Sequence, residues 1–119
     1  MSERRSAAFV VACPDCEERR ATDDANETVA FYRRHRAATG HDVVWERAAF
    51  DGDDALPDGD LAAIVDELDG RHEDGVPIGV VAAALGARGV SMGETLERIR
   101  ALRMRGGLYE PRDDHLRAT

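Results

Sequence analysis

The stretch that most directly decides the fold spans residues 90–117 and reads VSMGETLERIRALRMRGGLYEPRDDHLR. Ser91 is a good helix N-cap, and Glu94, three residues later, completes the pattern of a capping box. Apolar residues then recur at the spacing of one helix face, and they are Met92, Leu96, Ile99 and Leu102. Gly106 and Gly107 predict the end of this helix, because glycine adopts the left-handed conformation that a C-terminal cap needs.

The residues after this helix predict a small β-hairpin. Residues 108–112 favour a strand, residues 113–114 a tight turn, and residues 115–117 a short return strand. A helix that stops at a glycine pair and continues into a hairpin is typical of the end of a winged helix-turn-helix domain.

Two further helices are predicted before residue 90. Residues 60–70 carry an apolar stripe at helical spacing, formed by Leu61, Ile64, Val65 and Leu68. A polar loop over residues 71–76 leads to Pro77, which suits the first turn of a helix. The second helix contains Ile78, Val81, Ala82 and Leu85 and ends within residues 86–89. Three helices and a hairpin predict a winged-helix domain over residues 60–119.

Three segments of this region carry a resemblance to a known family. They are LAAIVDEL (61–68), GVPIGVVAAALGARGV (75–90) and TLERIRALRMRGGLYEPRDDHLRAT (95–119), of which GGLYEPRDDHLR is the most specific part. The region from about residue 58 to residue 119 resembles the C-terminal winged-helix domain of the archaeal minichromosome maintenance helicase. The helicase's ATPase has no counterpart here, so the resemblance implies a small domain that contacts DNA or a replication partner, without helicase activity.

The N-terminal part of the chain predicts a second, smaller unit over residues 1–47. Residues 7–12 are an apolar run that favours a strand, and residues 17–22 can return as an irregular second strand. A helix begins at Asp23 or Asp24, with Glu27 as capping-box partner of Asp24, and it ends at Gly40. Residues 42–47, DVVWER, predict a closing strand.

Four residues of this unit predict a metal site. Cys13, Cys16, His35 and His41 form the pattern C-x2-C-x18-H-x5-H. A CxxC turn supplies two thiolates, and one histidine late in a helix with a second just past its glycine stop supplies the other pair of a tetrahedral zinc site. In so small a unit the zinc would be structural and would provide folding energy.

The pattern resembles a C2H2-type zinc finger, in which Tyr32 matches an apolar core position. The segment between Cys16 and His35 is longer than the usual spacing of about 12 to 15 residues. Two alternatives stay open for the cysteines, a redox pair and two free thiols. A redox pair usually opens a helix, and here the next helix starts several residues later.

Residues 48–59, AAFDGDDALPDG, are rich in Asp, Gly and Pro and predict a linker. The expected fold class is therefore α+β, with a zinc-finger-like unit, a linker and a winged-helix domain.

The absence of targeting segments and of catalytic motifs predicts a non-catalytic protein of the cytoplasm. The 119 residues carry a net charge of −8, and all 16 basic residues are arginine, which resembles the composition of proteins from salt-accumulating archaea. No apolar run approaches the roughly 20 residues of a membrane helix, and the N-terminus has too short an apolar run for a secretory signal. Phosphate-loop and GxGxxG motifs are absent, so we expect no nucleotide. We expect no catalysis, because no nucleophile–base set stands out from the acidic background.

The acidic charge is weak evidence against DNA, since in about molar salt the Debye length is only about 3 Å. Residues 88–117 hold seven arginines against five acidic residues, whereas the first 85 residues hold nine against nineteen. We therefore expect double-stranded DNA to bind at Ser91, Arg98 and Arg105 on the third helix and at Arg112 and Arg117 on the hairpin.

The alternative function is a protein-interaction adaptor that docks on replication or transcription proteins without direct DNA binding. Glu94 and Glu97 on the third helix and Asp113 and Asp114 in the hairpin turn favour it, because these carboxylates would oppose phosphates.

Overall fold

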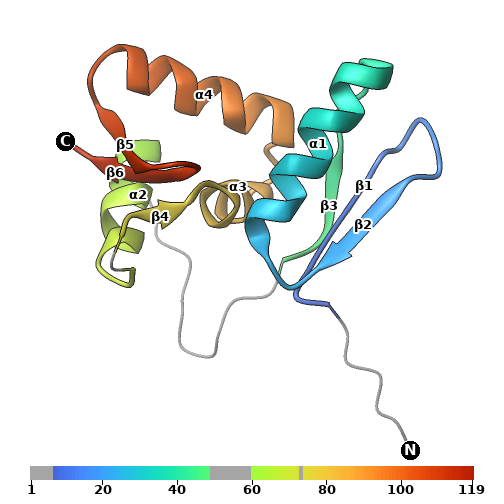
Figure 1. The fold of residues 1–119 in the computed structure, drawn as a ribbon, viewed down its shortest axis with the longest axis horizontal. Coiled ribbons are helices and arrows are strands. Elements are labelled where there is room, and N and C mark those ends of the chain that lie inside the picture. Colours follow the sequence, from blue (N-terminus) through green and yellow to red (C-terminus); the bar gives the residue numbers. More distant parts are fainter. Residues whose placement is uncertain (1–6, 49–59, 73) are drawn as a thin grey trace, which may run out of the picture.

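The computed structural model describes residues 7–48, 60–72 and 74–119. In this part of the chain, two antiparallel sheets lie on either side of the buried helix α3 (Ile78–Gly86), as Figure 1 shows. The predicted α+β class is confirmed at this level. The predicted linker, residues 48–59, lies outside the described residues except for residue 48, which ends a strand.

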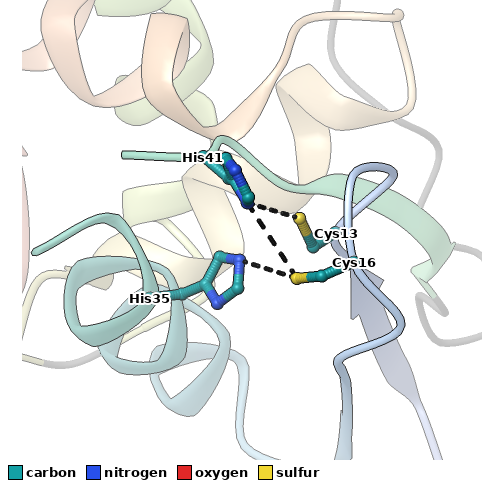
Figure 2. Close-up of side chains that lie close together, drawn as sticks. All are labelled: Cys13, Cys16, His35 and His41. Carbon is teal, nitrogen blue, oxygen red and sulfur yellow. Dashed lines mark hydrogen bonds between the residues drawn. The ribbon is translucent and has the colours of Figure 1, made fainter. Parts of the chain in front are cut away.

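The N-terminal sheet contains β1 (Phe9–Ala12), β2 (Arg19–Thr22) and β3 (Val44–Ala48), in the order β2-β1-β3. The turn from β1 to β2 carries the two cysteines (Figure 2). Helix α1 (Ala25–Thr39) follows β2 and ends at Gly40, which has a φ of +78°. The left-handed conformation of Gly40 turns the chain back toward β3.

The start of α1 differs in one detail from the predicted capping box. The carboxylate of Asp24 caps the helix by accepting a hydrogen bond from Asn26 N at 3.0 Å. The carboxylate of Glu27 does not return to the cap: it accepts from the guanidinium of Arg20 at 2.6 Å. The nearby arginine on β2 offers a charged donor, which makes a stronger hydrogen bond than a neutral backbone N–H.

The C-terminal part begins with α2 (Leu61–Asp69), which is capped by Asp60. After α2 come β4 (Val76–Pro77), α3, α4 (Met92–Met104), β5 (Leu108–Arg112) and β6 (His115–Ala118). These strands form an antiparallel sheet in the order β4-β6-β5. The helices and the hairpin lie where the sequence predicts them.

The predicted position of Pro77 in the first helical turn is wrong by one residue. Pro77 is the N-cap of α3, with a φ of −55°, and it also belongs to β4. Val76, expected in a polar loop, is fully buried and pairs with Leu116 of β6. This two-residue strand depends on a partner 40 residues further along, which a local pattern cannot reveal.

Helix α4 has both of the predicted ends. Ser91 Oγ accepts a hydrogen bond from Glu94 N at 3.1 Å, although the Glu94 carboxylate turns to Arg98 and leaves the capping box half formed. Gly106 has a φ of +82°, and Gly107 N donates to Leu102 O at 2.9 Å. The two glycines thus close a Schellman motif. Thr95, which the apolar pattern missed, is fully buried, and its hydroxyl donates to the carbonyl of Ser91.

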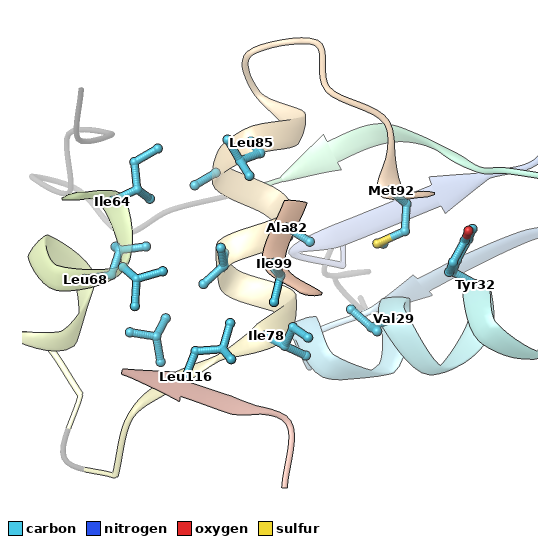
Figure 3. Close-up of a cluster of buried hydrophobic side chains, with 14 of the residues drawn as sticks. Val29, Tyr32, Ile64, Leu68, Ile78, Ala82, Leu85, Met92, Ile99 and Leu116 are labelled. Carbon is cyan, nitrogen blue, oxygen red and sulfur yellow. The ribbon is translucent and has the colours of Figure 1, made fainter. Parts of the chain in front are cut away.

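Buried side chains from both parts of the chain meet in a shared core around α3 (Figure 3). Val29 of α1 lies on one side of α3, and Ile64 of α2 and Leu116 of β6 lie on the other. Helix α3 is itself buried over most of its surface, which explains its run of valine, alanine and leucine. Among the described residues, no helix combines the length and the apolar character needed to span a lipid bilayer.

Three glycines spaced seven residues apart lie where the two parts of the chain touch. A Cβ atom added to Gly79 would overlap the backbone of Ala25 in α1, and one added to Gly86 would overlap the ring of Trp45 in β3. A Cβ atom at Gly93 would lie 2.6 Å from Asp42 Oδ2. We call these contacts the glycine seam; they bring the backbone of α3 and α4 directly against the N-terminal part.

Candidate metal centre

Cys13, Cys16, His35 and His41 converge at one end of the N-terminal sheet (Figure 2). Cys13 follows β1, Cys16 lies in the turn to β2, His35 projects from the last turns of α1, and His41 follows Gly40. Their ligand atoms all lie within 4.8 Å of one another. The structure therefore brings together all four residues that the sequence predicts as metal ligands, and this group could hold a metal ion.

The distances in the cluster suit a tetrahedral ion. Cys13 Sγ lies 3.5 Å from His41 Nδ1, and Cys16 Sγ lies 3.5 Å from His35 Nε2. The remaining sulfur–nitrogen contact shown in Figure 2, between Cys16 and His41, is 4.0 Å. Zinc with bonds of about 2.3 Å to sulfur and about 2.0 Å to nitrogen would separate S and N ligands by about 3.5 Å in a tetrahedron. The donor set and these separations are consistent with a zinc site.

Local hydrogen bonds shape the turn that holds the cysteines. Cys13 N donates to Glu18 O at 2.9 Å, which closes the loop between β1 and β2. Asp15 N donates to Cys13 Sγ at 3.4 Å. These two hydrogen bonds fix the position of the Cys13 sulfur within the turn.

His35 is held in one orientation by its neighbours. Its side chain is buried, and its ring stacks on Phe31 with centroids 5.5 Å apart. Nε2 faces Cys16, while Nδ1 lies 3.5 Å from the Glu18 carboxylate. A carboxylate beside the second ring nitrogen favours a proton there, which leaves Nε2 free to bind a metal.

His41 is positioned by the end of α1. Its backbone N donates to Thr39 Oγ1 at 3.1 Å, and that hydroxyl donates to His35 O at 2.7 Å. The same threonine therefore links the segments that carry the two histidines. Together with the turn at Gly40, this brings Nδ1 of His41 toward both sulfur atoms.

The protonation of the Cys16 thiol affects how a metal ion can bind. A hydrogen bond with Cys13 is the main cause that raises the pKa of the Cys16 thiol above its usual value. Cys16 is therefore protonated at neutral pH when no metal is bound, and a metal ion must displace that proton.

The predicted DNA-contacting residues lie in two separate places. Ser91 begins α4, and Arg98 and Arg105 are exposed further along the same helix. Arg98 and Arg105 line a groove of about 560 Å³ between α2, α3 and α4, and Arg98 pairs with Glu94 at 2.6 Å. On the hairpin, Arg112 pairs with Asp74 at 3.4 Å and Arg117 pairs with Asp69 of α2 at 3.1 Å.

Asp42, next to His41, is a residue whose role the sequence did not indicate. Its carboxylate accepts a hydrogen bond from Gly93 N in the first turn of α4, at 2.9 Å. The partner lies 51 residues away, so no local signal in the sequence could have revealed this contact.

The comparisons with known proteins match both halves of the chain. Residues 10–47 match the family model described as HVO_B0008 N-terminal, and residues 66–116 match the one described as HVO_B0008 C-terminal domain. No curated protein matches the chain, and no solved structure does. The first segment contains the four clustered cysteines and histidines, and the second contains α3 and α4. The chain is therefore similar, in the same order from N- to C-terminus, to two families described under one name.

Proposed function

We propose that the protein is a non-catalytic DNA-binding protein of transcription or replication, stabilised by zinc at Cys13, Cys16, His35 and His41. In this proposal residues 60–119 form a winged helix, and α4 is its recognition helix. The observation that carries the proposal is the order of elements: helix, short strand, two helices and a hairpin, with the strands in one small sheet. A winged helix has this order, and its last helix commonly enters the major groove of DNA.

The arginines on α4 favour contact with DNA over the alternative that this face of the helix is only exposed to solvent. Arg98, Ala101 and Arg105 are exposed on one side of it. The ion pair of Arg98 with Glu94 is exposed at both partners, and such a pair contributes only about 0–1 kcal/mol. A phosphate group can therefore replace the Glu94 carboxylate at little cost. The resemblance to the helicase's winged-helix domain makes replication a natural setting.

The test is fluorescence anisotropy of a labelled random-sequence duplex, titrated with zinc-loaded protein over a range of KCl concentrations. We expect log K to fall linearly with log[KCl], with a slope that reports the phosphates contacted. The variant Arg98→Gln/Arg105→Gln should weaken binding and reduce the slope by about 2. The matched control is Arg100→Gln/Arg103→Gln, because those arginines lie on the side of α4 that faces β5. An equal loss of DNA affinity in the two double variants would show that the side of α4 that carries Arg98 and Arg105 does not contact the DNA.

A second candidate function, a protein-interaction adaptor, is favoured by the turn of the hairpin. Asp114 O accepts hydrogen bonds from Ile78 N and from the Asn26 side chain, and the Asp114 carboxylate pairs with Arg33 at 3.1 Å. The turn is thereby fastened to α1 and α3, whereas a DNA-binding wing projects toward the backbone. Absence of duplex binding at the lowest salt at which the protein stays folded would favour the adaptor.

A further inference from the structure

The side chain of Asp42 links the segment that carries His41 to α4. Asp42 directly follows His41, and its Oδ1 accepts hydrogen bonds from Gly93 N at 2.9 Å and from Val43 N at 2.7 Å. Gly93 lies in the first turn of α4, where backbone N–H groups have no partner within the helix. The next amide, Glu94 N, is capped by Ser91 from α4's own chain. One cap of α4 is therefore local, and the other comes from the residue beside a candidate metal ligand.

The segment that carries Asp42 is short and anchored on both sides. Gly40 ends α1 before it, and Val43 after it is fully buried in the core. Between these anchors, the position of Asp42 is fixed by His41 on one side and by Gly93 on the other. The fit at Gly93 is close: an added Cβ would lie 2.6 Å from Asp42 Oδ2 and 2.9 Å from Tyr32 Oη.

We infer that Asp42 couples the metal centre to α4, so that a metal ion holding His41 also holds a carboxylate against the first turn of that helix. This inference rests on the proposed metal function and adds a means of regulation to it. A carboxylate at a helix N-terminus is favourable because it faces the positive end of the helix dipole. Without metal, the His41 ring is no longer held by an ion, and the hydrogen bond from Gly93 N to Asp42 opens more often.

The coupling acts in both directions. Whatever binds to the first turn of α4 changes the affinity of the metal by the same factor by which the metal changes its affinity. The pocket around this turn is lined by residues of both parts of the chain, among them Tyr32, Arg36, Asp42 and Ser91. The affinity of a DNA or protein ligand that contacts α4 there would therefore depend on whether a metal ion is bound at the metal centre.

Amide hydrogen exchange of the ¹⁵N-labelled full chain, at saturating zinc, tests this coupling. Gly93 is a direct reporter, because its N–H donates to Asp42. The two variants to compare are His41→Asn and His35→Asn, since each removes one histidine and only the first lies beside Asp42. We expect Gly93 exchange to accelerate by about tenfold or more in His41→Asn and by less than about threefold in His35→Asn. Ala63 N, capped by Asp60 in α2, should be unchanged in both.

Equal acceleration in the two histidine variants, or none in His41→Asn, would overturn the coupling. His35 is buried, so His35→Asn could fail to fold. In that case the variant Asp42→Ala is used instead, and its zinc affinity is measured in competition with a chromophoric chelator. If the two sites are coupled, loss of the hydrogen bond between Asp42 and Gly93 should weaken zinc binding by about tenfold, and an unchanged affinity would overturn the inference. Failure of the unaltered chain to bind one zinc ion would instead overturn the proposed metal function.

Discussion

At the scale of single residues, the Cys16 thiol gives metal binding a pH dependence of definite sign. Its pKa is raised by the hydrogen bond with Cys13, so the metal-free form carries a proton at neutral pH. Zinc displaces this proton, and the apparent affinity should rise about tenfold per pH unit for each proton released. A competition titration with a chromophoric chelator between about pH 6.5 and 8.5, below the raised pKa of the Cys16 thiol, measures this slope.

The control for that titration is Cys16→Ser, which removes the displaced proton together with the ligand. We expect it to lower the affinity and to flatten its pH dependence. An affinity of the unaltered chain that stays constant over the whole range would mean that Cys16 is not a ligand in its thiolate form.

Gly79 offers a second prediction at the residue scale, on stability. A Cβ atom there would meet the backbone of Ala25, which cannot move without separating α1 from α3. We expect Gly79→Ala to lower the free energy of unfolding by about 1–3 kcal/mol. The matched control is Gly70→Ala, because Gly70 has a right-handed helical φ of −64° and an added Cβ would make only an ordinary van der Waals contact, 3.6 Å from Glu67 O. Urea denaturation should find the control as stable as the unaltered chain or slightly more so.

At the scale of elements, the C-terminal end of α4 allows the free-energy cost of a left-handed backbone conformation to be measured separately from any steric clash. Gly106 has a φ of +82°, and an added Cβ would meet nothing within 4 Å. Gly106→Ala should therefore destabilise the protein by about 1 kcal/mol through conformation alone. Gly106→Asn should recover part of this loss, since asparagine tolerates the left-handed region better. Thermal unfolding of the three proteins ranks them, and an alanine variant as stable as the unaltered chain would contradict this account.

The same elements show what a sequence reveals. Ser91 at the start of α4 and Gly106 at its end act within a few residues of themselves, so their effects could be predicted from the local pattern. The C-x2-C turn and the histidines around Gly40 could also be predicted as a group, because a C-x2-C turn and a histidine pair at the end of a helix are typical of a metal site. Their convergence confirmed the predicted cluster.

The features that the sequence did not reveal depend on how the folded chain places their partners. Val76 forms a strand because Leu116 lies beside it, and Asp42 caps a helix that begins 50 residues later. Glu27 leaves its expected capping role because Arg20 of β2 is within reach. The contacts of Val76 and Asp42 join residues 40 and 51 positions apart, so no window of neighbouring residues reveals them. Arg20 is only seven positions from Glu27, but which donor the Glu27 carboxylate takes depends on where β2 lies in the folded chain.

At the scale of the whole molecule, the shared core predicts that zinc stabilises both parts of the chain together. Val29 and Ile64, from opposite sides of α3, belong to one buried cluster. At a free zinc concentration about a thousandfold above Kd, binding contributes about 4 kcal/mol, which corresponds to about 15 °C in Tm for a chain of this size. Chelation should lower Tm by this amount in one transition, measured by circular dichroism.

Trp45 supplies a second probe for the same experiment, because it packs on Gly86 of α3. Its fluorescence should change at the same temperature as the circular dichroism signal, with and without zinc. Two separate transitions, one of them insensitive to chelator, would show that the C-terminal part unfolds independently.

The glycine seam has a consequence for how such a chain can change over generations. Gly79, Gly86 and Gly93 leave room for Ala25, Trp45 and Asp42, so an enlargement on one side demands a compensating loss on the other. We therefore expect substitutions on the two sides of the seam to be coupled, and a half transplanted from a protein with different residues at these contacts to fit poorly. A chain cut between residues 48 and 60 should, by the same complementarity, yield two pieces that recognise each other and reassemble.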